Sequence, residues 1–152
     1  MKKQSAGLMM YRRGEGVVEI LLAHPGGPFW KNKDAGAWTI PKGEPADGED
    51  LLAAAIREFK EELGVEATGP FQSLGSITQK AGKVVHAWAF EGDLNPAEIQ
   101  SNFFEMEWPP RSGRKMTFPE VDRAEFFSLE EARGKMNAAQ VEFLGRLEKL
   151  LF

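Results

Sequence analysis

The stretch Gly43–Val65, GEPADGEDLLAAAIREFKEELGV, contains the clearest helix pattern in the chain. Its apolar residues recur at i, i+3, i+4, i+7 and i+11, the spacing of a helix face that packs on a core. The residues on this face are Leu52, Ala55, Ile56, Phe59 and Leu63.

The ends of this helix carry recognisable signals. Asp47 or Gly48 is placed to cap its start, and Glu49 and Asp50 then fall in the first turn, where the helix dipole favours negative charge. Gly64 is placed to end the helix, because glycine adopts the left-handed conformation at little cost.

Three glutamates, Glu58, Glu61 and Glu62, lie on about a quarter of the helix circumference. Like charges one turn apart cost about 0.2–0.5 kcal/mol, and the cost rises in a dry site. A divalent cation reverses the sign of this interaction, because Mg²⁺ prefers carboxylate, water and phosphate oxygens. The spacing therefore predicts a Mg²⁺ site, in which Mn²⁺ can substitute. The alternative is a solvated face on which Arg57 pairs with Glu61, with Lys60 as a neighbour.

The same stretch resembles the signature of the Nudix hydrolase family at every fixed position. The resemblance implies a Nudix-type α/β/α sandwich, an α/β fold with a mixed β-sheet. It also implies a metal-dependent hydrolase acting on nucleoside diphosphates linked to another group. Within the signature, Glu49 and Arg57 match the pair that shapes the motif, and Arg57 joins the catalytic set. The matching residues are Gly43, Glu49, Arg57, Glu58, Phe59, Glu61, Glu62, Gly64 and Val65.

The resemblance also assigns the metal ligands and the catalytic base. Glu58 and Glu62 match the principal metal carboxylates, Glu61 is a further ligand, and the Gly43 turn supplies a backbone carbonyl. In the family the base is often a glutamate outside the motif, and Glu120 precedes the last predicted strand at such a place. The alternatives for the base are Glu105, Glu107 and, within the motif, Glu61.

A basic segment, WPPRSGRKMTF (108–118), carries three cations and no acid. Arginine suits bidentate contact with phosphate, although a flexible basic surface loop would read the same way. Trp108 or Phe118 can stack on a base, and a lysine directly precedes Gly43. The predicted substrate-binding residues are Lys42, Arg111, Arg114, Lys115 and Trp108.

The rest of the chain is interspersed strands and helices without a βαβα rhythm, which favours a mixed sheet over a doubly wound parallel one. We expect hairpins over 5–25 and 69–93, joined by a loop over 26–43 with a short strand near 38–40 and then by the helix of the motif. An irregular loop is expected over 94–122, followed by a strand over 124–128. A capping box at Ser128 and a terminal helix over 138–152 complete the predicted elements.

Composition narrows the function classes. The 152 residues carry a net charge of −4, which suits one domain over 1–152 and gives no reason to expect a nucleic-acid partner. No cysteine is present, and His24 and His86 are the two histidines, which excludes disulfides and Cys-based or three-histidine metal sites. No window approaches the roughly 18 apolar residues of a membrane span. We expect a cytoplasmic monomer or homodimer without a membrane partner.

The substrate is less clearly encoded. AGAWTIPKGE (35–44) resembles the approach to the motif in the diadenosine tetraphosphate and diphosphoinositol branches of the family. Gly82 and Lys80 stand where other branches carry a marker tyrosine or proline. A dinucleoside polyphosphate and a nucleoside triphosphate therefore both stay open as substrates. The alternative to an enzyme is a catalytically silent nucleotide- or RNA-binding regulatory module on the same fold.

Overall fold

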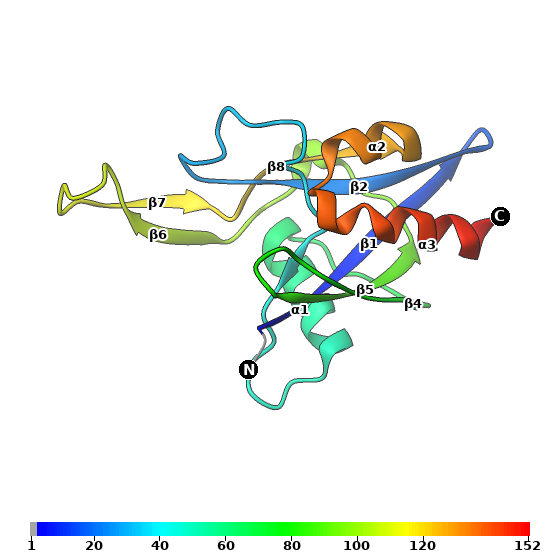
Figure 1. Cartoon of the computed structure of the whole chain (residues 1–152). Helices are drawn as coiled ribbons and strands as arrows, with labels where there is room; N and C mark the ends of the chain where they lie inside the picture. Colours follow the sequence, from blue (N-terminus) through cyan, green and yellow to red (C-terminus); the bar gives the residue numbers. More distant parts are fainter. Residues whose placement is uncertain (1–2) are drawn as a thin grey trace.

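A mixed β-sheet forms the centre of the fold (Figure 1), in a computed structural model that describes residues 3–152. Its strands run in the order β4-β5-β1-β2-β8, and short β3 also pairs with β1. β1 and β5 are parallel and the other pairs are antiparallel, which confirms the predicted mixed sheet. The strands are β1 (Gln4–Gly14), β2 (Val17–Pro25), β3 (Lys42–Gly43), β4 (Gln72–Thr78), β5 (Val84–Glu91) and β8 (Val121–Ser128).

Two apolar clusters cover the two faces of the sheet, which explains why β1 is buried along most of its length. On one face Phe59 and Leu63 of α1 (Leu51–Leu63) pack against Leu8. On the other face Met9 packs with Leu144 of α3 (Glu142–Leu151) and with α2 (Leu129–Lys135). Figure 1 shows α1 on one side of the sheet and α2 and α3 on the other, so the predicted sandwich is confirmed.

The helix of the glutamate motif begins later than predicted. Asp50, rather than Asp47 or Gly48, is the N-cap, and its side chain accepts a hydrogen bond from the Ala53 amide at 3.1 Å. Asp50 caps because its carboxylate reaches the free amides of the first turn, whereas Gly48 has a φ of 75° in the preceding turn. Gly64 ends the helix with a φ of 75°, as predicted.

The segment 94–122 is not an irregular loop. After the short 3₁₀ turn η1 (Pro96–Glu98) it forms a separate hairpin of β6 (Phe103–Glu107) and β7 (Lys115–Pro119). This hairpin projects from the body of the molecule in Figure 1. The alternation of apolar and polar residues explains these strands. The pairs Phe104–Phe118 and Met106–Met116 lie on one side of the hairpin, and the pairs Glu105–Thr117 and Glu107–Lys115 lie on the other.

Two smaller expectations also need correction. Residues near 38–40 form no strand; they make single bridges, Ala23 to Thr39 and Trp38 to Met136, and the short strand is β3. The terminal helix begins at Glu142, because Asn137 first caps the 3₁₀ turn η2 (Ala138–Gln140). The hairpins over 5–25 and 69–93 and the capping box at Ser128 are confirmed.

No helix within residues 3–152 combines the length and the apolar character needed to cross a membrane.

Candidate active site at the end of α1

Arg57 organises the acidic end of α1. Its guanidinium donates to both carboxylate oxygens of Glu49, at 2.9 and 3.0 Å, and to Glu58 at 2.9 Å and Glu61 at 3.1 Å. The Arg57 hydrogen bonds lower the pKa of Glu49 to about 2. The Arg57–Glu61 pair, which the alternative of a solvated helix face predicts, is present. Arg57 also donates hydrogen bonds to Glu49 and Glu58, which a simple surface pair does not explain.

Glu58 and Glu62 lie deeper than Glu61. Glu62 is 8% exposed, and the Glu58 side chain is 15% exposed against 41% for Glu61. Burial raises the pKa of Glu58, with a further contribution from the charge of Glu61. Burial raises the pKa of Glu62 well above 4.5, and the charge of Glu58 adds to it. The two carboxylates therefore share a site in which negative charge is disfavoured.

Strand β3 brings the chain preceding the motif against these carboxylates. Ala6 and Gly7 of β1 pair with Gly43 and Lys42. A Cβ atom on Gly43 would overlap the carboxyl group of Glu58, so only glycine allows this approach of backbone to side chain. Burial lowers the pKa of Lys42, with a contribution from Lys83, and the charges of Glu62 and other glutamates oppose the shift.

Glu120 reaches the same place from the start of β8. A cavity of about 270 Å³ is lined by Glu62, Lys42 and Glu120 together with Trp30 and Thr39 of the loop between β2 and β3. The charge of Glu120 contributes to the raised pKa of both Glu58 and Glu62. Thr39 was not among the predicted site residues, and no pattern in the sequence marks it, whereas Trp30 lies in a glycine-rich loop that leaves it open to a ligand.

Two of the alternative candidates for the base, Glu105 and Glu107, lie on the hairpin and line no part of this cavity. Glu105 is 3.7 Å from the ammonium group of Lys115, and Glu107 accepts a hydrogen bond from the Arg111 amide at 3.0 Å. Because neither Glu105 nor Glu107 lines the cavity, Glu120 is the glutamate outside α1 that does so.

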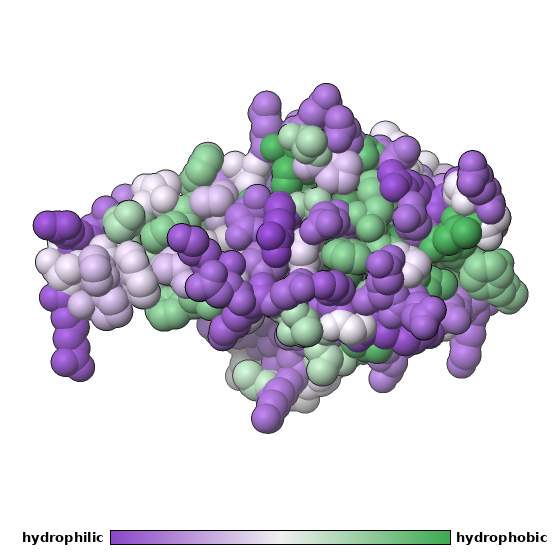
Figure 2. Space-filling model, turned by 90° about the horizontal axis from the view of Figure 1, so that it is seen from above, coloured by the Kyte–Doolittle hydropathy of each residue, from purple (hydrophilic) through white to green (hydrophobic). Residues whose placement is uncertain are grey.

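The basic segment is divided between two places. Trp108 lines a second cavity, of about 500 Å³, beside Phe118 and the loop after β2. Arg111, Arg114 and Lys115 are exposed at the turn of the hairpin. Figure 2 shows hydrophilic side chains at this projecting end of the molecule. Contact of these three cations with substrate stays a prediction.

His24 is fully buried. Its Nδ1 lies 2.8 Å from Oδ1 of Asp122, and its Nε2 lies 2.6 Å from the carbonyl oxygen of Lys33. Both ring nitrogens of His24 are therefore engaged, one by a side chain of β8 and one by the main chain of the loop. His24 thus ties the loop between β2 and β3 to the start of β8.

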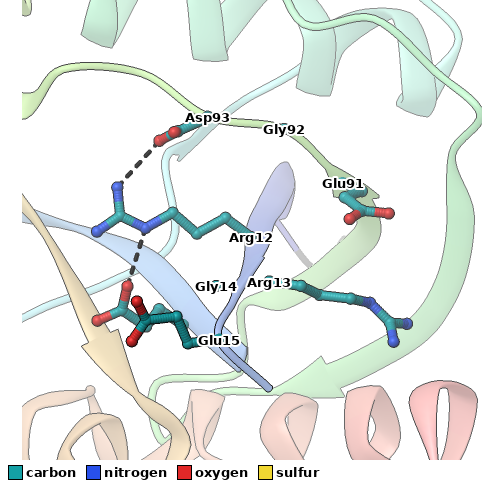
Figure 3. A pocket seen from close by; sticks show the side chains of 8 residues that line it. Arg12, Arg13, Gly14, Glu15, Glu91, Gly92 and Asp93 are labelled. Carbon is teal, nitrogen blue, oxygen red and sulfur yellow. Dashed lines mark hydrogen bonds and ion pairs between the residues drawn. The ribbon is translucent and has the colours of Figure 1, made fainter. Parts of the chain in front are cut away.

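A further hollow, of about 630 Å³, lies at the turn between β1 and β2 (Figure 3). Arg12 donates to Glu19 at 2.9 Å and to Asp93 at 3.0 Å there, and it lies over the Phe126 ring. These charges satisfy one another, and no residue of the glutamate motif lines this hollow.

The site at the end of α1 fits a hard divalent cation by the chemistry of its donors. Glu58 and Glu62 are carboxylates that burial disfavours as anions, and Gly43 brings main chain against them. Within residues 3–152, no three acidic or histidine side chains are already gathered at metal-binding spacing. Arg57 donates to Oε1 of Glu58 and to both carboxylate oxygens of Glu61, so a cation at these carboxylates would compete with the arginine.

Comparison with known proteins identifies the family. The sequence profile of the NUDIX domain matches residues 1–147, and the chain belongs to the Nudix hydrolase family. An asymmetrical bis(5'-nucleosyl)-tetraphosphatase of Rattus norvegicus is 30% identical over 112 residues, 66% of this chain and 72% of the relative. The enzyme of that name from Caenorhabditis elegans is 42% identical over 65 residues, 43% of either chain, so the match spans less than half of that relative.

Solved structures agree with this assignment. A C. elegans Ap4A hydrolase binary complex superposes with a TM-score of 0.70 at 27% identity, covering 97% of both chains. The NUDIX domain of Shewanella oneidensis NrtR, solved with ADP ribose, also gives a TM-score of 0.70. It is 12% identical over all of this chain and 90% of that one, so this likeness shows the fold alone.

Proposed function

We propose that the chain is a Mg²⁺-dependent pyrophosphohydrolase that cleaves a phosphoanhydride bond of a dinucleoside polyphosphate. The observation that carries the proposal is that Glu62 and Glu120 line one cavity and that Glu58 is close enough to both to interact through its charge. Burial and mutual repulsion raise the pKa of Glu58 and of Glu62. Relatives named as tetraphosphatases and the Ap4A hydrolase structure support the choice of substrate.

Each residue of the site is assigned one role in hydrolysis. Glu58 and Glu62, with the Gly43 carbonyl and Glu61, hold the cation, and Lys42 meets a phosphate oxygen. Glu120 takes a proton from the attacking water, since it lines the cavity without belonging to α1. Arg57 keeps Glu49, Glu58 and Glu61 in position. A bound Mg²⁺ supplies neutralisation of charge on the phosphate oxygens and a more acidic water.

The experiment is a product analysis with purified protein. Diadenosine tetraphosphate and a panel of nucleoside triphosphates are incubated with and without Mg²⁺, and the products are separated by ion-exchange chromatography. The proposal expects Mg²⁺-dependent conversion of diadenosine tetraphosphate into two mononucleotides. Faster turnover of a nucleoside triphosphate would move the substrate to that class. A folded protein that binds these nucleotides but converts none would favour the silent binding module.

A further inference from the structure

We propose that the cavity between the β6–β7 hairpin and the loop after β2 is the binding site for a nucleobase of the substrate. The inference rests on the proposed function, because it takes the polyphosphate to lie in the cavity of Glu62 and Glu120. The residues that line the hairpin cavity include Pro28, Lys31, Trp108, Met116, Phe118 and Asp122.

The lining of this cavity suits a flat aromatic ring. Trp108, Met116 and Phe118 come from one side of the hairpin, the side that also carries Phe104. The Trp108 ring is held edge-on against Phe29 at a centroid distance of 5.4 Å. Phe29 is 59% exposed and Met116 is 44% exposed, so the structure leaves apolar surface open around Trp108. Stacking on an aromatic side chain contributes about 1–3 kcal/mol per base, whichever base it is.

The position of the cavity links it to the reaction. Pro119 and Asp122 line it, while Glu120 and Val121, which lie between them in the sequence, line the catalytic cavity. The Gly26 amide donates to the Glu120 carbonyl at 2.9 Å, so the two cavities share one thin wall of main chain. The two cavities are therefore neighbours, as the base and the polyphosphate of one substrate require.

Charged groups are also present to orient the base. Asp122 lines the cavity, and its Oδ1 lies 2.8 Å from Nδ1 of buried His24, which leaves Oδ2 to accept a hydrogen bond from a ligand. Lys31 supplies a donor on the opposite loop. Every natural base offers both an N–H donor and a nitrogen or carbonyl-oxygen acceptor, so this pair orients the base without choosing among bases.

Binding of 2-aminopurine riboside triphosphate tests the inference without turnover, because stacking quenches the fluorescence of the base. The titration uses the Glu62→Gln protein without divalent metal. We expect saturable quenching, and Trp108→Ala in that background should weaken binding at least tenfold. Trp108→Phe should recover most of the affinity. Phe103→Ala is the matched control, since Phe103 lies on the same hairpin, is 65% exposed and does not line this cavity.

Equal affinity and equal quenching in the folded Trp108→Ala and Phe103→Ala proteins would overturn the inference. Steady-state kinetics on diadenosine tetraphosphate separate it from the proposed function. Trp108→Ala in the otherwise unchanged enzyme should raise KM about tenfold with a smaller effect on kcat. Normal hydrolysis with an unchanged KM in this variant would reject the base site alone. Quenching by a protein that hydrolyses none of the substrates would reject the proposed function and leave the base site standing.

Discussion

The end of α1 and the β6–β7 hairpin differ in almost every physical respect. At the end of α1, carboxylates lie close together, and the Arg57 guanidinium donates hydrogen bonds of 2.9–3.1 Å to three of them. The hairpin is exposed, carries cations at its turn and joins apolar residues on one side. The difference teaches that most of the groups proposed for chemistry lie on a helix packed against the sheet, whereas those proposed for base recognition lie on a projecting hairpin.

The largest expected effect is at the buried glutamate. Glu62→Gln keeps the shape of the side chain and removes its charge, and we expect kcat on diadenosine tetraphosphate to fall at least about a hundredfold, or roughly 2.7 kcal/mol. Glu66→Gln is the control, because Glu66 is exposed, follows the end of α1 and forms an ion pair with Lys60. Unchanged turnover in Glu62→Gln would remove Glu62 from the metal site.

The second prediction concerns the proposed base. Glu120→Gln should lower kcat at least about tenfold, because the water would lose its proton acceptor while the cation site stays intact. Glu105→Gln and Glu107→Gln on the hairpin are the matched controls. A fall of less than tenfold for Glu120, or a larger fall for either control, would move the base away from Glu120.

The third prediction uses stability against pH. The pKa of Glu62 is raised in the folded protein, so above about pH 4.5 the folded state binds more protons than the unfolded state. Its contribution to the free energy of unfolding therefore falls as pH rises. Glu62→Gln should remove this penalty and raise Tm by about 2 °C or more at pH 8, without Mg²⁺.

Glu49 provides the opposite sign for comparison. Its pKa of about 2 means that its ionised form stabilises the folded state above its ordinary value of 4.5, and that this contribution is lost as pH falls toward 2. Glu49→Gln should therefore lower Tm by a constant amount above pH 6 and flatten the acid limb of the Tm–pH curve, because the variant has no carboxylate to lose. Parallel curves for the two variants would contradict both assignments.

The smallest expected effect is at the turn of the hairpin. Arg111→Ala with Arg114→Ala should raise KM about threefold in low salt, and the difference should vanish at high salt, because exposed charges act through a screened field. A loss of kcat in this double variant would contradict the assignment of the hairpin to substrate binding and of α1 to the chemical step.

The fold of the first region could be predicted because its signals are local. The 3.6-residue period from Leu52 to Leu63, Gly64 at the C-terminal end and the spacing of the motif are all contained in one stretch. The exact N-cap was missed, since Asp47, Gly48 and Asp50 carry equivalent sequence signals, and only the turn at Gly48 separates them.

The hairpin could have been found from alternation, since Phe104 and Met106 alternate with glutamates. The prolines and glycines between its strands hid that signal. The site beyond α1 depends on long-range contacts that no local pattern records. The contact of His24 with Asp122 and the position of Trp30 at the cavity both follow from how β2, its loop and β8 meet.

Uptake of Mn²⁺, followed by the loss of the electron paramagnetic resonance signal of the aqueous ion, tests the metal site most directly. The wild-type protein and the Glu66→Gln control should take up Mn²⁺, and a Glu58→Gln, Glu62→Gln double variant should bind it at least tenfold more weakly. Mn²⁺ uptake that is the same in the folded double variant and in the wild type, or absent from both, would contradict a cation held by the glutamates of α1.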